Sequence, residues 1–144
     1  MARAPDEVEA GDGRAEMILR DCLQGFDAIR LRVTGDCMAP ALRPGDLVTV
    51  RSTRSCPPRL GDVVLFRAAG GLRLHRLVPG LPRDGSLLRP KADRAPHWDA
   101  PIDRAALIGT VVSLQRDDHA LHPRSVVAAL RSALHGLATR LRLP

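Results

Sequence analysis

Aromatic side chains are scarce in this chain. Of its 144 residues only Phe26, Phe66 and Trp98 are aromatic, and tyrosine is absent. Proteins that bind single-stranded nucleic acid combine a basic groove with aromatic side chains on which the bases stack. The chain is basic, with 22 Lys+Arg against 16 Asp+Glu and a net charge of +6, but it lacks the aromatic part of that pattern. We therefore expect no nucleic-acid partner.

Cysteine is also scarce, and its spacing is irregular. The three cysteines are Cys22, Cys37 and Cys56. An odd number without regular spacing does not describe a disulfide framework, and the lack of a CxxC pair argues against a structural zinc site. No motif in the sequence implies a cofactor.

Long apolar runs are missing as well. The N-terminal residues are polar and acidic, without the apolar segment that a secretory signal needs. No stretch approaches the roughly 18–20 apolar residues that span a bilayer. We therefore expect a soluble protein of the reducing cytoplasm.

The composition suits one folded domain, since 44% of the residues are hydrophobic. Residues 1–13 are acidic and contain proline and glycine, which predicts a disordered lead. Residues 14–25 have apolar positions at helical spacing, among them Met17, Ile18 and Leu23, and predict a short amphipathic helix that ends at Gly25.

Between residues 26 and 115 the pattern changes to short strands. Ile29, Leu31 and Val33 alternate with arginine, and later apolar segments follow Gly, Pro and Asp turns. The further strands are expected at 47–50, 63–66, 72–75, 87–88 and 107–114, with loops at 79–86 and 89–103. The sequence predicts a mainly β fold, an antiparallel β domain with a short N-terminal helix and a C-terminal amphipathic helix.

That second helix is expected at residues 123–142. Pro123 suits a first helical turn, and one apolar stripe recurs at three- and four-residue steps. The helix could pack on its own domain. Because it is basic and amphipathic, it could instead make a peripheral contact with a membrane surface, or bind a partner.

The segment from Gly35 to Asp46 is the most informative in the chain. A strand ends near Val33, the chain turns through Gly35, and the thiol of Cys37 follows directly. Pro40 stiffens the next part of the loop. A nucleophile on a rigid turn is positioned without a large ordering cost, and its backbone N–H can help to hold an oxyanion. Taken alone, however, such a cysteine is more often a small buried hydrophobe than a catalytic residue.

Five short motifs in this part of the chain occur in an order that resembles type I signal peptidases and the related self-cleaving SOS repressors. The first matches Gly-x-Ser-Met-x-Pro, except that cysteine replaces serine, and the third matches the His-Arg-Val of the archaeal and endoplasmic-reticulum enzymes. The resemblance covers about residues 29–114. The five motifs are Gly35-Asp36-Cys37-Met38-Ala39-Pro40 with its following Gly45-Asp46 turn, Gly61-Asp62 before an apolar strand, His75-Arg76-Leu77, Lys91-Ala92-Asp93 and Ile108-Gly109-Thr110-Val111.

The resemblance implies a fold of the signal-peptidase type and a role for each matching residue. Cys37 would be the nucleophile, with its backbone N–H in the oxyanion hole, and His75 would be the base. Asp93 would orient His75, by the logic of catalytic triads. Met38 and Pro40, in the nucleophile motif, would contact the substrate.

Three departures from the family pattern affect this interpretation. Cysteine replaces serine at position 37 and Ala92 replaces a glycine, and no membrane anchor is present. Histidine is a natural partner for a thiol, because a neighbouring imidazolium lowers a thiol pKa from its reference near 8.5. Lys91 is the only lysine but falls in the fourth motif rather than the third, which argues against a lysine base. Asp99 is a secondary acidic candidate.

Three functions fit the sequence. The first is an endopeptidase that processes a peptide or protein substrate, for which the family implies small residues before the cleaved bond. The second is self-cleavage at Ala10-Gly11, a bond of the type that SOS repressors cut, although it lies only 26 residues before Cys37. The third is a non-catalytic binding module, against which the retention of His75 and Asp93 argues. The sequence leaves the oligomeric state open.

Overall fold

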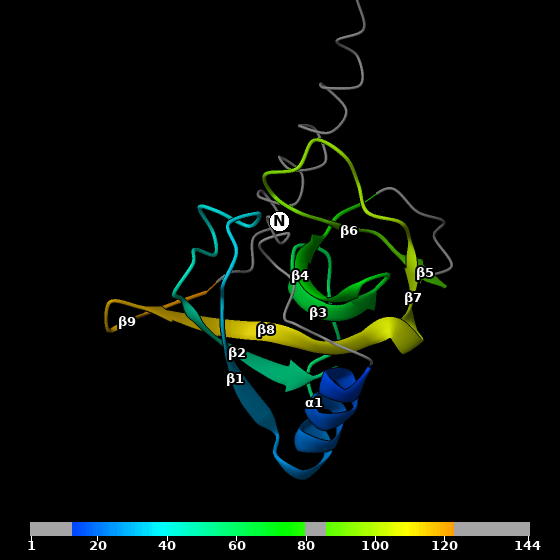
Figure 1. Cartoon of the computed structure of the whole chain (residues 1–144), viewed down its shortest axis with the longest axis horizontal. Coiled ribbons are helices and arrows are strands. Elements are labelled where there is room, and N and C mark those ends of the chain that lie inside the picture. Colours follow the sequence, from blue (N-terminus) through cyan, green and yellow to red (C-terminus); the bar gives the residue numbers. More distant parts are fainter. Residues whose placement is uncertain (1–12, 80–85, 123–144) are drawn as a thin grey trace, which may run out of the picture.

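Most of the described chain belongs to one antiparallel sheet. The computed structural model describes residues 13–79 and 86–122 (Figure 1). In the sheet the strands follow the order β1-β2-β8-β3-β4-β6, and β9 pairs with β8. A separate two-stranded sheet is formed by β5 and β7. The strands are β1 Ala28–Arg32, β2 Leu47–Ser52, β3 Val63–Ala68, β4 Gly71–Leu77, β5 Leu87–Leu88, β6 Pro90–Lys91, β7 Ile102–Asp103, β8 Leu107–Arg116 and β9 His119–Leu121.

The helix α1 (Arg14–Gly25) packs against the β1, β2 and β8 end of the sheet (Figure 1). Its range is the one expected for the N-terminal helix, but its buried face differs from the expected one. Met17 and Ile18 are 60% and 55% exposed, whereas Leu23 is buried and Leu19 packs against the core. The sheet therefore meets only the face that carries Leu19 and Leu23.

The two Gly-Asp motifs have the same local structure. Gly45 and Gly61 both have φ of +91°, in the left-handed region that glycine adopts without strain. Asp46 and Asp62 each accept, through Oδ2, a hydrogen bond of 2.8 Å from the backbone N–H three residues earlier. Each turn leads directly into a strand, β2 after the first and β3 after the second, so the repeated motif is a rigid strand start.

The main core lies between α1 and the sheet and extends to the loop that joins β1 to β2. Alternate side chains of β2 and β4 point into it, as period-two patterning requires. Met38 and Leu42, from the loop, are as deeply buried as the strand residues. The core contains Leu23, Val33, Met38, Leu42, Val48, Val50, Val63, Leu65, Leu72, Leu74, Ala92, Ile108, Val111 and Leu114.

This architecture confirms the predicted mainly β, antiparallel class. The short strands β6 and β7 lie at the two ends of a segment that we expected to be a loop, and β9 was not expected. The residues of the predicted 123–142 helix, and residues 1–12 of the predicted lead, lie outside the described residues. No helix within the described ranges has the length and apolar character to cross a bilayer.

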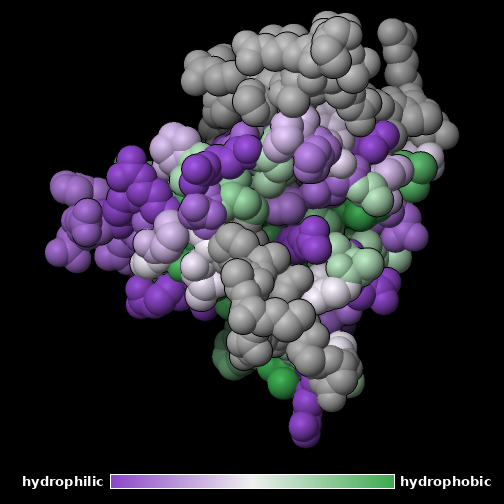
Figure 2. All heavy atoms as spheres, turned by 45° about the horizontal axis from the view of Figure 1, so that its top comes forward, coloured by the Kyte–Doolittle hydropathy of each residue, from purple (hydrophilic) through white to green (hydrophobic). Residues whose placement is uncertain are grey.

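The described surface is mostly polar. Figure 2 shows hydrophilic residues gathered at the end of the molecule where β9 lies, with apolar residues in small separate patches. The large hydrophobic side chains that remain exposed come from several elements. They are Met17, Ile18, Phe26, Leu60, Leu87 and Leu121.

Gly109 provides a test of the packing between β8 and β2. A Cβ atom at this position would lie 2.4 Å from Val50 Cγ1 and 2.7 Å from the Arg51 carbonyl oxygen. Because backbone cannot yield to such a contact, we expect Gly109→Ala to lower the free energy of unfolding by about 1–3 kcal/mol, measured by urea denaturation. At Gly25 a Cβ would meet nothing within 4 Å, so Gly25→Ala should leave stability unchanged or raise it. Equal losses in the two variants would contradict the packing described here.

Candidate active site

Cys37 lies in the loop between β1 and β2, and the base of this loop is closed by backbone hydrogen bonds. Val33 N–H donates to Asp46 O, and Gly45 N–H donates to Val33 O, both at 2.8 Å. Within the loop the side chain of Met38 is 2% exposed and belongs to the core. The residue next to the thiol is therefore anchored in the protein interior, which fixes the main chain at Cys37.

The main chain on both sides of Cys37 is held by further contacts. Ala39 N–H donates to Asp36 O at 3.0 Å, which places Cys37 within a tight turn. The carbonyl oxygen of Cys37 accepts a 2.9 Å hydrogen bond from Arg94 N–H, and the Arg94 guanidinium pairs with Asp36 at 2.8 Å. The nucleophile turn is thus bound to the segment after β6.

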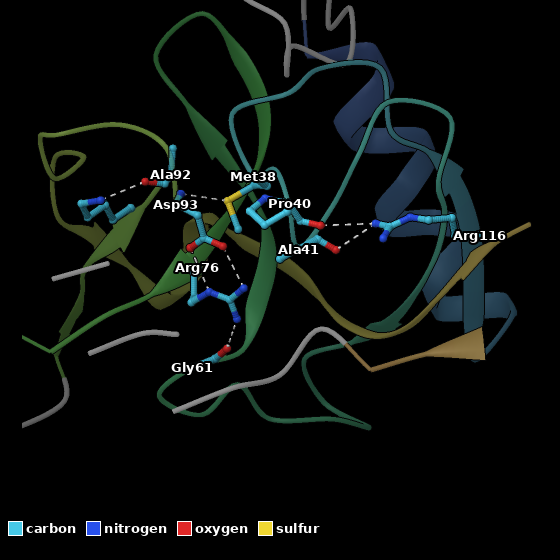
Figure 3. A network of polar contacts seen from close by, with 9 residues as sticks. Met38, Pro40, Ala41, Gly61, Arg76, Ala92, Asp93 and Arg116 are labelled. Carbon is cyan, nitrogen blue, oxygen red and sulfur yellow. Dashed lines mark hydrogen bonds and ion pairs between the residues drawn. The ribbon is translucent and has the colours of Figure 1, made fainter. Parts of the chain in front are cut away.

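Arg116, at the end of β8, holds the far side of the same loop. Its guanidinium forms two hydrogen bonds to the Asp46 carboxylate, of 2.9 and 2.6 Å. It also donates a 3.3 Å hydrogen bond to Ala41 O (Figure 3). Burial acts to raise the pKa of Asp46, but the hydrogen bonds from Arg116 and from the Arg43 N–H outweigh it and hold this pKa below its usual value. The loop that carries Cys37 therefore depends on an ionised Asp46.

His75 lies on β4, opposite Val64 of β3, and its side chain reaches the thiol. The Cys37 Sγ–His75 Nε2 distance is 3.3 Å. His75 is only 4% exposed, and the Phe66 ring packs against its edge with the ring centroids 5.7 Å apart. The imidazole is therefore shielded from water on the sheet side and directed at the thiol by its packing.

The other ring nitrogen of His75 meets the carboxylate of Asp99. Nδ1 and Asp99 Oδ2 form a short hydrogen bond. An ionised carboxylate can only accept, so Nδ1 carries the proton in this contact. Nε2 is then left to take the thiol proton, or to donate to a thiolate once the ring is charged. The three side chains form a continuous chain from sulfur through imidazole to carboxylate.

The sequence also matches a known protein family. A family model described as Peptidase S24-like matches residues 1–112. The chain belongs to the Peptidase S24-like family. This confirms the superfamily expected from the five motifs and supports a peptidase or self-cleaving protein on this fold. No match was found among the curated proteins.

Within this S24-like fold, the structure corrects the assignment of Asp93. Its carboxylate forms a two-point ion pair with the Arg76 guanidinium, both contacts at 2.9 Å (Figure 3). The carboxylate at His75 Nδ1 belongs to Asp99 instead. The fourth motif therefore does not supply the orienting acid. The sequence contains a weak signal for Asp99, an acid six residues further on, but the irregular segment around it has no periodicity from which to infer its direction.

The remaining candidates lie around the site in different ways. Met38 was expected to contact substrate, but its burial contradicts this: its sulfur accepts a 3.3 Å hydrogen bond from Asp93 N–H inside the protein. Pro40 is exposed, and its contact with substrate stays a prediction. Lys91 is fully buried on β6, where its amine donates to Ala92 O at 3.0 Å. Burial lowers the Lys91 pKa, although Asp93 and Asp99 act to raise it.

The two aspartates should differ sharply when each is replaced by asparagine. Asp93→Asn removes the charge partner of Arg76, which is 0% exposed, so we expect the free energy of unfolding to fall by about 3 kcal/mol. Asp99 is more exposed, with 22% of its side chain accessible, so Asp99→Asn should cost less than about 1.5 kcal/mol. Urea denaturation of both variants measures this. A larger loss for Asp99→Asn would contradict the assignment.

The Asp46–Arg116 pair predicts a pH-dependent stability. Because the folded-state pKa of Asp46 lies below its unfolded value near 3.8, the pair stabilises the fold above that pH and loses its effect as pH falls through the folded pKa. We expect Arg116→Met to lower the free energy of unfolding by about 3 kcal/mol at pH 7. The difference from the wild type should shrink below about pH 4, where Asp46 of the variant is protonated.

A matched control for this test is Arg32→Met. The Arg32 guanidinium also holds the Gly45-Asp46 turn, through a 2.9 Å hydrogen bond to Gly45 O, but it is exposed and bonds a neutral carbonyl. This variant should lose only about 0.5 kcal/mol, independently of pH. A pH-independent effect of Arg116→Met would show that the ionised Asp46 is not what the loop depends on.

Proposed function

We propose that the protein is an endopeptidase in which Cys37 is the nucleophile, His75 the general base and acid, and Asp99 the residue that orients His75. The observation that carries the proposal is the chain of contacts from Cys37 Sγ to His75 Nε2 and from His75 Nδ1 to Asp99. Nucleophile, base and orienting group in hydrogen-bond order are the recognised geometry of covalent peptide hydrolysis.

The first step is the formation of an acyl-enzyme. His75 takes the thiol proton, and the Cys37 thiolate attacks the carbonyl carbon of the scissile bond. The carboxylate of Asp99 stabilises the imidazolium that results. His75 then donates its proton to the leaving amine, the C–N bond breaks, and the acyl group stays on sulfur as a thioester.

The second step returns the thiol. His75 takes a proton from water, and the resulting hydroxide attacks the thioester. The C–S bond breaks to release the carboxylic acid, and the imidazolium returns its proton to the Cys37 sulfur. In both steps the negative charge on the carbonyl oxygen needs donors. The Cys37 backbone N–H is one candidate: among residues 13–79 and 86–122 it has no hydrogen-bond acceptor, so it is open to an oxyanion.

The substrate class follows from the family rather than from a pocket. The resemblance implies small side chains before the cleaved bond, so peptides with alanine or glycine at that position are the first substrates to test. Cleavage between two molecules and self-cleavage use the same three residues. The protein concentration separates them, because self-cleavage within one molecule has a half-time independent of concentration.

The test is cleavage of a peptide library with small residues before the scissile bond, followed by mass spectrometry. We expect Cys37→Ala and His75→Ala each to lower kcat/KM by at least roughly 10³-fold. Wild-type protein that is quenched in acid should carry the acyl group as an added mass on Cys37. The matched controls are Cys22→Ala and Cys56→Ala, which remove the other half-buried free thiols and should keep full activity.

Two outcomes would overturn the proposal. Cleavage that survives Cys37→Ala would assign the activity to another group or to a contaminant. Cleavage confined to the Ala10-Gly11 bond of the chain itself would instead identify a self-cleaving protein, if its rate is independent of concentration and Cys37→Ala abolishes it.

A further inference from the structure

Asp99 lies in a part of the chain without regular secondary structure, between β6 and β7. A carboxylate on such a segment reaches His75 reliably only if its main chain is held in place, because ordering a free residue costs conformational entropy. The Asp99 backbone N–H donates to Pro90 O at 3.1 Å. That single bond fixes one side of the residue and leaves its carbonyl side to be held by something else.

The carbonyl side is held by Arg89, the residue between β5 and β6. Arg89 Nη1 donates a 3.0 Å hydrogen bond to Asp99 O. The same guanidinium lies over the ring of Trp98, with its Cζ 5.5 Å from the ring centroid, within the range of a cation–π contact. One side chain therefore holds both Asp99 and the residue before it.

The main chain of Arg89 is bound to the strand that carries His75. Its carbonyl oxygen accepts a 3.0 Å hydrogen bond from Val78 N–H, directly after the end of β4. Arg89 thus bonds to the end of β4 through its backbone and to Asp99 through its side chain. The span from the Arg89 backbone to its guanidinium therefore sets how far the Asp99 carboxylate lies from the His75 ring.

The orientation of the Arg89 guanidinium lowers the stability of the fold at one atom, and a purely structural role does not explain that loss. The Nε atom of Arg89 is buried and has no hydrogen-bond partner among the described residues. An unsatisfied buried donor is destabilising because it has lost its hydrogen bond to water, and such groups in native structures call for an explanation. A guanidinium oriented to hold Asp99 and Trp98 together, at the expense of its third nitrogen, supplies one.

We propose that Arg89 is a positioning residue for Asp99, which it holds at the distance from β4 at which the carboxylate reaches His75 Nδ1. The proposal rests on the proposed function for its catalytic meaning, but the geometry can be tested without any substrate. Arg89 itself contacts neither Cys37 nor His75 in the described structure, so its influence on the imidazole must pass through Asp99.

The measurement is the titration of the His75 ring by NMR in the full-length protein, with the ring signals assigned through His75→Gln. Among the described residues, the charged and titratable groups that contact the ring or lie beside it include Cys37, Asp99, the neighbouring Arg76–Asp93 pair and the buried Lys91. A change at Arg89 removes none of these groups. The loss of the Arg89 charge would by itself favour the imidazolium and raise the midpoint, so a downward shift reports on the position of Asp99.

We expect Asp99→Asn to move the His75 midpoint down by about one pH unit or more, because a nearby carboxylate favours the imidazolium. Arg89→Met should move it in the same direction by about half as much, and Arg89→Lys should recover part of the shift. The double variant Asp99→Asn/Arg89→Met should move no further than Asp99→Asn alone, as expected for residues that act through one contact.

The matched control is Arg20→Met. The Arg20 guanidinium also donates to backbone carbonyl groups, Leu107 O and Ala105 O, but it does so on α1, away from the site. It should lower Tm without moving the His75 midpoint. If Arg89→Met does the same, or if its shift adds fully to that of Asp99→Asn, Arg89 has only a structural role and the proposal is wrong.

Trp98→Leu covers the case in which Arg89→Met does not fold. It removes the ring under the guanidinium and leaves the Arg89–Asp99 hydrogen bond possible, so we expect a smaller downward shift. An unchanged midpoint in a folded Trp98→Leu protein would count against the proposal. Since the titration needs no cleavage, an inactive wild-type protein with a shifted Arg89→Met midpoint would reject the proposed function and retain the role of Arg89.

Discussion

The buried ion pair between Arg76 and Asp93 is the contact on which the site depends. Arg76 follows His75 on β4, is 0% exposed, and reaches both Asp93 and the carbonyl of Gly61 in the second Gly-Asp turn. A guanidinium without water can remain charged only beside such partners. The pair therefore fixes the segment after β6 against β4. Since successive side chains of a strand point to opposite faces, Arg76 and His75 leave β4 on opposite faces.

Two of the three site residues are positioned from that segment. Asp93 N–H donates to the sulfur of Met38 (Figure 3). Arg94 N–H donates to the carbonyl of Cys37. Further along, the same stretch of chain presents Asp99 to His75. Asp93, which the family pattern suggests for catalysis, instead aligns the turn around Cys37 and the segment that carries Asp99. A residue can therefore belong to a motif of the site without touching the Cys37 thiol or the His75 ring.

The sequence predicts the fold, and it predicts that Cys37 and His75 lie together, for a physical reason. Strands such as Val63–Ala68 have apolar runs bounded by Gly-Asp turns, and both features are local. Cys37 and His75 lie in motifs whose order reflects the strands that carry them. The strand β9 escaped prediction because its turn uses Asp117 and Asp118 in the left-handed region, at φ of 47° and 64°, where glycine or asparagine is more usual.

The third site residue could not be predicted in the same way. The direction of the Asp99 side chain depends on contacts with other parts of the structure, such as the hydrogen bond from Arg89 to the Asp99 carbonyl oxygen. No periodicity in the 92–101 stretch encodes these contacts. Asp93 was the natural choice because a motif position is visible in sequence and an ion pair with a neighbouring strand is not. Likewise the burial of Met38 follows from the closure of the loop on the core, not from the motif that contains it.

The central claim is that Cys37 and His75 form a reactive pair, and the pH dependence of Cys37 alkylation by iodoacetamide tests it most directly. The experiment compares the wild-type site with His75→Ala, both in a background in which Cys22 and Cys56 are alanine. We predict a thiolate that titrates well below the ordinary value near 8.5 and moves up towards it when His75 is removed. A Cys37 thiol that does not react, or whose titration is indifferent to His75, would contradict the account.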